Sequence, residues 1–245
     1  MKKRIINILM IAILIVSLIG IIYSGYNIIV WKKNVDRNKE IKKEINKSIT
    51  VDEEVESEEE KYSVDFEELK KVNSDTVAYL KVNNTNIDYV VVKGNDNSYY
   101  LNHNFYNEYN IAGWVFADYK NKLDGTDRNL VIYGHSTKDG SMFGTLGETQ
   151  KKSWQENSDN LIVLVTENEK ALYKVFSTYT IVPEDYYITT DFTSDEEFKE
   201  FITELKSRSN YDYNVDVDPG DSILTLSSCN LTGSRRIVLH AKKID

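Results

Sequence analysis

The distribution of apolar residues divides the chain into three parts. No charged side chain occurs between Ile5 and Trp31, and the stretch IINILMIAILIVSLIGIIY within this segment is almost wholly apolar. The segment from Lys32 to Lys61 is dominated by charged residues, first of both signs and then acidic (DEEVESEEE). Beyond it, short apolar runs alternate with polar turns to the end of the sequence. We therefore divide the chain into residues 1–31, 32–61 and 62–245.

The first part predicts a transmembrane anchor. A helix rising about 1.5 Å per residue over this segment would reach roughly 40 Å, more than the roughly 30 Å hydrocarbon core of a bilayer. A cleavable signal peptide is the competing interpretation, but no small-residue cleavage site follows the apolar run. The cations at positions 2–4 favour a cytoplasmic N-terminus and an extracellular remainder. Residues 32–61 are too charged and too poor in aromatics to build a core, so we expect a solvated stalk.

Eight short runs after the stalk are rich in Val, Ile, Tyr and Thr and have the length of β-strands. They are TVAYLKV (76–82), NIDYVVVK (86–93), GWVFADY (113–119), NLVIYGH (129–135), NLIVLVT (160–166), KALYKVFSTYTIV (170–182), SILTLSSC (222–229) and RIVLHAKK (236–243). Many strands with few helices predict a mainly β protein, in which the strands close into a barrel and the helices lie outside it.

Three helices are expected around this sheet. The clearest is SDEEFKEFITELKSR (194–208), where Ser194 and Glu197 have the spacing of a capping box and apolar residues recur every three or four positions. A weaker helical pattern covers SMFGTLGETQKKSWQEN (141–157). Ser63 is a candidate N-cap for a short helix whose apolar face carries Phe66, Leu69 and Val72.

Composition and charge exclude several functions. A net charge of −9 argues against a nucleic-acid surface, which requires a basic face. The single cysteine cannot form an internal disulfide, and the three histidines, at positions 103, 135 and 240, are too scattered to indicate a metal site. We therefore expect neither a metal nor another cofactor.

Two of the residues that carry reactive groups follow predicted strands. His135 ends the run LVIYGH and Cys229 ends SILTLSSC. A lone histidine is most often a packing or surface residue, and a lone cysteine is most often a small buried apolar residue. Strand ends, however, are where barrels present working side chains. A single Cys with a distant His in an extracytoplasmic protein is a candidate catalytic pair that the fold brings together.

Further candidates surround this pair. Arg236 opens the last predicted strand, and antiparallel pairing with the strand that ends at Cys229 would bring it close to the sulfur. Arg235 would then point away. Ser227 and Ser228, next to the cysteine, are candidates for substrate contact, as is Tyr133. His240 lies further along the last strand, and we expect it to be structural.

A strand-end His, a strand-end Cys and an Arg opening the next strand, in this order behind a membrane anchor, resemble the sortases, the cysteine transpeptidases of Gram-positive bacteria. The stretch TLSSC (225–229) resembles the family motif T-L-x-T-C, with Ser228 in place of threonine. The stretches FEELKKVNSDTVAYLKV (66–82) and YYLNHNFYNEYNIAGWVFADYKN (99–121), with the helix at 194–208, resemble class B sortases. The resemblance extends from about residue 62 to the C-terminus.

The resemblance implies an eight-stranded sortase-type β-barrel with a cleft that holds His135, Cys229 and Arg236. It implies that Cys229 attacks the threonine carbonyl of a C-terminal sorting signal on a surface protein, of a type such as N-P-x-T-N or P-x-T-G. The resulting thioester would be resolved by an amine of peptidoglycan or of its lipid-linked precursor. His135 would transfer protons and Arg236 would bind the substrate carbonyl or the oxyanion.

Two other functions stay open at this point. A papain-like cell-wall cysteine peptidase uses the same pair of side chains, although there the cysteine usually precedes the histidine and begins a helix. A membrane-tethered binding module with no catalytic activity would use the barrel only as a scaffold. Such a module would not depend on Cys229 or His135.

Overall fold

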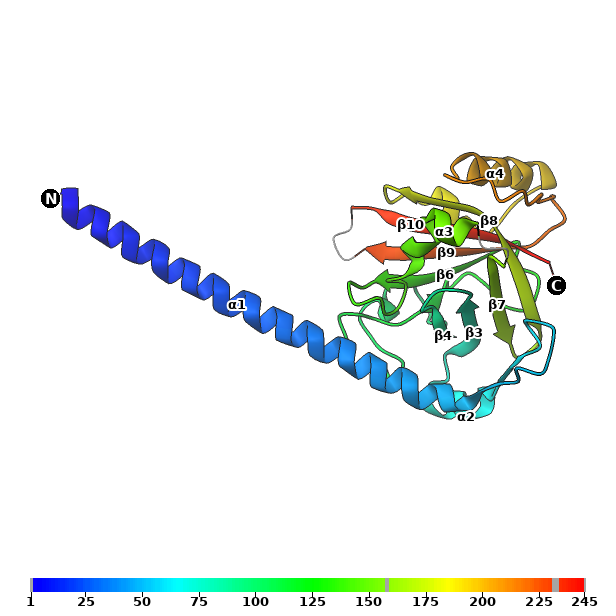
Figure 1. Ribbon diagram of the computed structural model, residues 1–245, viewed down its shortest axis with the longest axis horizontal. Helices are drawn as coiled ribbons and strands as arrows, with labels where there is room; N and C mark the ends of the chain where they lie inside the picture. Colours follow the sequence, from blue (N-terminus) through cyan, green and yellow to red (C-terminus); the bar gives the residue numbers. More distant parts are fainter. Residues whose placement is uncertain (1, 157–158, 231–233, 245) are drawn as a thin grey trace.

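The computed structural model describes residues 2–156, 159–230 and 234–244, with the backbone alone at Lys2, Cys229 and Asn230. Its most extended element is the helix α1 (Lys2–Ile45), which leads from the N-terminus to the folded domain (Figure 1). Within the described residues, α1 is long and apolar enough to cross a membrane. The apolar part of α1 projects away from the domain, with its large side chains exposed.

The eight predicted strands form a closed barrel, which confirms the predicted fold class. Around the barrel the order is β10, β8, β7, β3, β4, β5, β6 and β9. The strands are β3 (Thr76–Val82), β4 (Asp88–Val92), β5 (Phe116–Ala117), β6 (Asn129–Ser136), β7 (Leu161–Thr166), β8 (Lys170–Ile181), β9 (Ile223–Asn230) and β10 (Arg236–Lys243). Two short strands, β1 (Ile49–Val51) and β2 (Tyr62–Val64), pair with each other outside the barrel.

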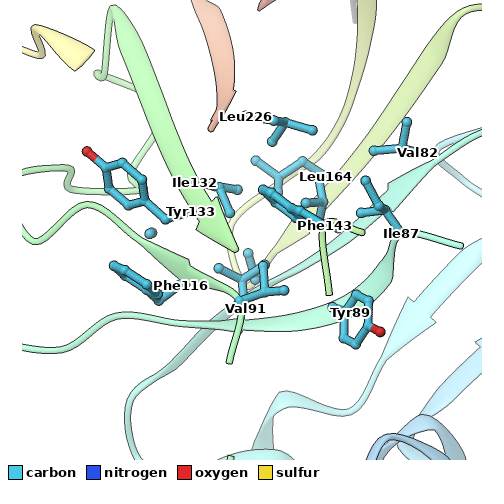
Figure 2. Close-up of a cluster of buried hydrophobic side chains, with 14 of the residues drawn as sticks. Val82, Ile87, Tyr89, Val91, Phe116, Ile132, Tyr133, Phe143, Leu164 and Leu226 are labelled. Carbon is cyan, nitrogen blue, oxygen red and sulfur yellow. The ribbon is translucent and has the colours of Figure 1, made fainter. Parts of the chain in front are cut away.

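The barrel encloses the main hydrophobic core. Figure 2 shows Val91 of β4, Ile132 of β6, Leu164 of β7 and Leu226 of β9 directed toward a common interior. Alternate residues along each strand supply these side chains, because successive side chains of a strand point to opposite faces. Most barrel neighbours are antiparallel, but β4 with β5 and β6 with β9 are parallel.

The helices lie outside the barrel, and the structure refines the predicted boundaries. They are α2 (Phe66–Val72), α3 (Lys152–Gln155) and α4 (Asp195–Ser207), with 3₁₀ turns η1 (Asn46–Ser48), η2 (Tyr99–Leu101), η3 (Leu146–Gln150) and η4 (Tyr186–Ile188). The predicted cap of α4 is confirmed, since the Ser194 hydroxyl accepts a hydrogen bond from the Glu197 N–H. The four apolar residues of its predicted face, Phe198, Phe201, Ile202 and Leu205, are buried.

Two helix predictions need correction. Ser63 lies in β2, and the side chain that caps α2 is Asp65, which accepts from the Glu68 N–H. The segment 141–157 contains η3 and the short α3 in place of one helix. Met142 has a φ of 50°, and a Cβ at Gly144 would lie 2.4 Å from the Thr137 carbonyl oxygen. The chain therefore turns sharply at this point before any helix can begin.

Residues 32–61 differ from the expected solvated stalk, because the C-terminal part of α1 packs against the barrel domain. Val35, Asn38, Ile41 and Ile45 are at most 4% exposed. They recur every three or four residues and form one face of the helix. The Arg37 guanidinium makes two 2.9 Å hydrogen bonds to Glu108 and lowers the pKa of that carboxyl to about 2. Charged residues occupy the remaining faces, and their abundance conceals the buried face in the sequence.

A buried hydrogen-bond network joins four barrel strands through His240, which is 0% exposed. Thr225 of β9 donates to Asn129 of β6 at 2.6 Å, so the His240 Nδ1–H must donate to the Thr225 hydroxyl at 2.9 Å. The Tyr179 hydroxyl then donates to Nε2 at 2.9 Å. Burial, together with the charge of Arg208, lowers the pKa of His240 to about 3. His240 is therefore a neutral structural residue.

This network makes stability depend on pH. In the unfolded chain His240 has a pKa of about 6.5, so between about pH 6.5 and pH 3 the unfolded state binds a proton that the folded state does not. Stability is then lost as the pH falls, by up to about 1.4 kcal/mol per pH unit from this residue. Urea unfolding of the full chain in detergent micelles, repeated between pH 7 and pH 4, gives the free energy of unfolding at each pH. This free energy should fall less steeply with falling pH in His240→Gln than in the wild type. Equal slopes would contradict this account.

Candidate active site

The parallel pairing of β6 with β9 places the two reactive positions side by side. The register pairs Tyr133 with Ser227, Gly134 with Ser228 and His135 with Cys229. Neighbouring strands lie about 4.8 Å apart, so the backbones at His135 and Cys229 are adjacent although 94 positions separate them in the chain. The side chain of Cys229 lies outside the described residues.

Hydrogen bonds to backbone groups hold both the ring and the main chain of His135. Its Nε2 lies 2.7 Å from the Leu101 carbonyl oxygen, and the His135 carbonyl accepts from the Phe143 N–H at 2.9 Å. A carbonyl oxygen can only accept, so Nε2 must carry a proton. The Phe143 ring packs directly on Gly134, where a Cβ would lie 2.7 Å from Cγ of the ring. A glycine is therefore required before His135.

Arg236 begins β10, next to the end of β9. The ladder between these strands ends with Val238 opposite Ser227. Arg236 lies two residues before Val238, and Cys229 two residues after Ser227, so both occupy the second position past the ladder. Among the residues that the structure describes, no carboxylate forms an ion pair with Arg236, and its Nη1 reaches only the Arg235 carbonyl at 3.5 Å. Its charge is thus available to a substrate.

A cavity of about 340 Å³ opens beside these residues. Its walls come from β5, β6, β9 and β10, from the segments around residues 97–101, and from the segment 183–188 after β8. The described lining residues are Asn97, Leu101, Phe116, Tyr133, Pro183, Glu184, Asp185, Tyr187, Ile188, Ser227 and Arg236. This mixture of aromatic and aliphatic side chains with a few polar groups is typical of a small ligand site.

Comparison with known proteins agrees with this geometry. The sortase domain family matches residues 80–244. Sortase B of Staphylococcus aureus is 34% identical over 182 residues, which cover 73% of this chain and 74% of that protein. The chain belongs to the sortase B family. Sortase B of Listeria monocytogenes is 36% identical over 168 residues, 66% of each chain.

Solved structures show the same relationship. The crystal structure of Bacillus anthracis sortase B in complex with AAEK1 has a TM-score of 0.76 and 32% identity, with 87% of this chain and 99% of that chain covered. A sortase B complexed with triglycine has a TM-score of 0.70 and 36% identity, over 74% of this chain and 85% of that chain. Sortases B are cysteine transpeptidases that anchor surface proteins, and the present chain is an enzyme of this class.

In this sortase, two of the three predicted substrate-contact residues line the cavity. The Tyr133 hydroxyl donates to Asp118 at 2.7 Å, and the Asn97 amide donates to the same carboxylate oxygen at 2.7 Å. The Ser227 hydroxyl lies 3.0 Å from the Tyr187 hydroxyl. These hydrogen bonds fix the orientation of the cavity wall, with Asp118 as an anchor for two of its side chains.

The third predicted residue, Ser228, has a different environment. It is 1% exposed, and it is not one of the described residues that line the cavity. Its hydroxyl accepts a 2.9 Å hydrogen bond from the Ile237 N–H, at the start of β10. The hydroxyl thus supports the backbone that carries Arg236. Threonine at this position would offer the same hydroxyl, which accounts physically for the departure from the family motif.

Sequence reasoning missed the cavity residues that come from loops. Asn97, Leu101 and Tyr187 lie in segments without periodic patterning, and no spacing links them to His135. Asp118 was part of a predicted strand, without any signal that it would bind Tyr133. Only the resemblance of the segment 99–121 to class B sortases pointed to this region.

Substitutions at Ser228 test its structural role. Ser228→Thr should retain turnover, because the hydroxyl still accepts from the Ile237 N–H. Ser228→Ala should leave this part-buried N–H without its partner and lower the free energy of unfolding by about 1 kcal/mol. Thermal unfolding of both variants, with sorting-peptide turnover as the second measurement, checks this. A fully stable Ser228→Ala variant would refute the assignment.

Proposed function

We propose that this sortase cleaves a C-terminal sorting signal of surface proteins after threonine and transfers the acyl group, through a thioester on Cys229, to an amine of peptidoglycan or of its lipid-linked precursor. The observation that carries the proposal is the parallel register of β6 and β9, with His135 beside Cys229 and Arg236 at the adjoining cavity. These are the groups that acyl transfer by a thiol requires.

In the first half-reaction, the Cys229 thiolate attacks the threonine carbonyl carbon, and a C–S bond forms as the carbonyl oxygen becomes an oxyanion. Arg236 stabilises this oxyanion, because its guanidinium keeps its charge and offers several donors. His135 gives a proton to the departing nitrogen, and the C–N bond breaks. The residues beyond threonine leave with a free amine, and the acyl group stays on sulfur as a thioester.

In the second half-reaction, an acceptor amine attacks the thioester carbon. His135 takes a proton from this amine as the new C–N bond forms, and the C–S bond breaks to restore the thiolate. Since Nε2 of His135 donates to the Leu101 carbonyl, we assign both proton transfers to Nδ1. One solved sortase B is complexed with triglycine, a peptide with a free amine, which supports an amine acceptor of this kind.

The N-terminal helix supports a membrane location for this reaction. We propose that residues 5–31 of α1 cross the membrane once, with the N-terminus in the cytoplasm and the barrel outside the cell. The cations at positions 2–4 favour this orientation. A membrane-anchored enzyme would then meet both a surface protein in transit and a lipid-linked acceptor near the bilayer.

The alternatives receive less support. A papain-like peptidase would place its cysteine at the start of a helix, whereas Cys229 lies in β9, next to last in that strand. A binding module without catalysis would not require a backbone acceptor that orients the ring of His135.

Substitution of the three proposed catalytic residues tests this mechanism in the full chain, in detergent micelles. Cleavage of quenched sorting peptides of the N-P-x-T-N and P-x-T-G types, with triglycine as the acceptor, reports both half-reactions. Cys229→Ala should abolish cleavage, and His135→Ala should lower turnover by about 10²–10⁴-fold because proton transfer is lost. Arg236→Ala should lower turnover by about 10²–10³-fold.

Arg235→Ala is the matched control, because this neighbouring arginine precedes the strand. Its turnover should stay within about twofold of the wild type, far from the loss expected for an oxyanion donor. If Arg235→Ala lost activity and Arg236→Ala kept it, the two assignments would be exchanged. Hydrolysis of wall peptides, without any transfer and without action on sorting peptides, would refute the proposed function.

A further inference from the structure

The buried face of α1 carries an asparagine cluster that contacts the loop 102–113. Asn38 is 2% exposed; its amide donates to the Gly113 carbonyl at 2.9 Å, and its carbonyl oxygen accepts from the Asn110 side chain at 2.8 Å. One turn earlier, the Asn34 side-chain oxygen accepts from the Ile111 N–H at 2.9 Å. A buried amide is costly unless its polar atoms are paired, and here both are.

Gly113 transmits this contact to η2. Its φ of 58° favours glycine, and a Cβ at this position would lie 2.4 Å from the Tyr100 carbonyl oxygen and 2.8 Å from the Leu101 carbonyl oxygen. The Trp114 N–H, one residue further, donates to the Tyr100 carbonyl at 2.9 Å. The backbone of Gly113 therefore lies close to the Leu101 carbonyl, without space for a side chain between them.

The Leu101 carbonyl is the group that binds Nε2 of His135, at 2.7 Å. Its oxygen is thus close both to the backbone of Gly113 and to the imidazole ring. A shift of the loop toward α1 would withdraw the acceptor and allow the ring to rotate. One continuous path of contacts therefore leads from the N-terminal helix to the ring. It begins at Asn34 and Asn38 on α1 and passes through Gly113 and Leu101 to His135.

We propose that Asn38 and Asn34 are positioning residues for catalysis, so that the helix leading to the membrane is part of the machinery that orients His135. This inference rests on the proposed role of His135 as the proton-transfer residue. The effect of these asparagines is on the geometry of the ring, through Gly113 and Leu101, and neither residue touches the substrate. A misplacement of about 1 Å at a reacting group can lower turnover about 100-fold.

The test compares two substitutions on the same helix face, in the full chain in detergent micelles. Asn38→Leu keeps the size and burial of the side chain and removes its hydrogen bonds. Ile41→Ala removes apolar packing from the neighbouring turn, where Ile41 is 0% exposed, and leaves the asparagine path intact. Asn38→Leu should lower kcat by between about tenfold and 100-fold with little change in KM. Ile41→Ala should lower the melting temperature and keep kcat, measured at a temperature where both variants are folded.

Asn34 supplies a second pair of variants if Asn38→Leu fails to fold. Asn34→Asp keeps the oxygen that accepts from the Ile111 N–H and loses only the bond within α1 from the side-chain amide to the Val30 carbonyl. Asn34→Leu removes the acceptor. The aspartate variant should retain kcat, and the leucine variant should lose it in the same direction as Asn38→Leu. Equal kcat values for the two Asn34 variants would overturn the proposal.

The ring geometry can be measured without turnover. The chain has three histidines, so selective ¹⁵N-histidine labelling gives three ring systems, which His103→Gln and His240→Gln assign by elimination. The Nε2–H signal of His135 should shift in Asn38→Leu and stay in place in Ile41→Ala. This measurement separates the catalytic role of His135 from the positioning role of the asparagines. Full turnover in His135→Ala would refute the catalytic role, but the Nε2–H signal would still report whether Asn38 orients the ring.

Two further results would overturn the positioning role. One is an unchanged kcat in Asn38→Leu, whatever the ring signal does. The other is a loss of kcat in Ile41→Ala as large as that in Asn38→Leu, since docking of the helix in general would then account for the effect.

Discussion

The structure depends above all on the parallel pairing of β6 with β9, which closes the barrel between two strands far apart in the chain. This pairing decides which residue of β9 lies beside each residue of β6 at the site. A slip by one position would move every side chain of β9 to the other face. The pairs at Tyr133 and Ser227 and at His135 and Cys229 therefore follow from one constraint. Chemistry at the end of these strands is a consequence of their register.

Buried polar groups hold this register. The network of Asn129, Thr225 and His240 crosses β6, β9 and β10, and each of its members has a partner, so no polar atom of the network opposes folding. The apolar pattern disfavours a slip by one residue, and the hydrogen-bond network adds a second constraint because its donors and acceptors are matched in the observed register. The burial that keeps His240 neutral also distinguishes it from His135, which lies at the strand end and is half-buried.

The helix α1 combines two environments in one continuous element. Its N-terminal part exposes apolar side chains suited to lipid, and its C-terminal part packs on the barrel through a face of apolar and amide residues. The same helix contacts the loop 102–113, so the proposed anchor and the proposed catalytic residue His135 are joined by a chain of contacts. The barrel domain is therefore held to α1 by packing as well as by the covalent chain (Figure 1).

Local patterns in the sequence were sufficient for the eight strands, for α4 with its Ser194 cap and for the long apolar helix, because each depends on neighbours within a few residues. The order of His135, Cys229 and Arg236 along the chain, with the TLSSC motif, was sufficient to indicate a sortase. The tertiary structure alone decided that Ser228 supports β10, that Asn38 lies on the buried face of an otherwise charged part of α1, and that the Leu101 carbonyl binds the ring of His135. Such contacts join segments tens of residues apart, and their partners are chosen by strand register and packing, for which no local spacing carries a signal.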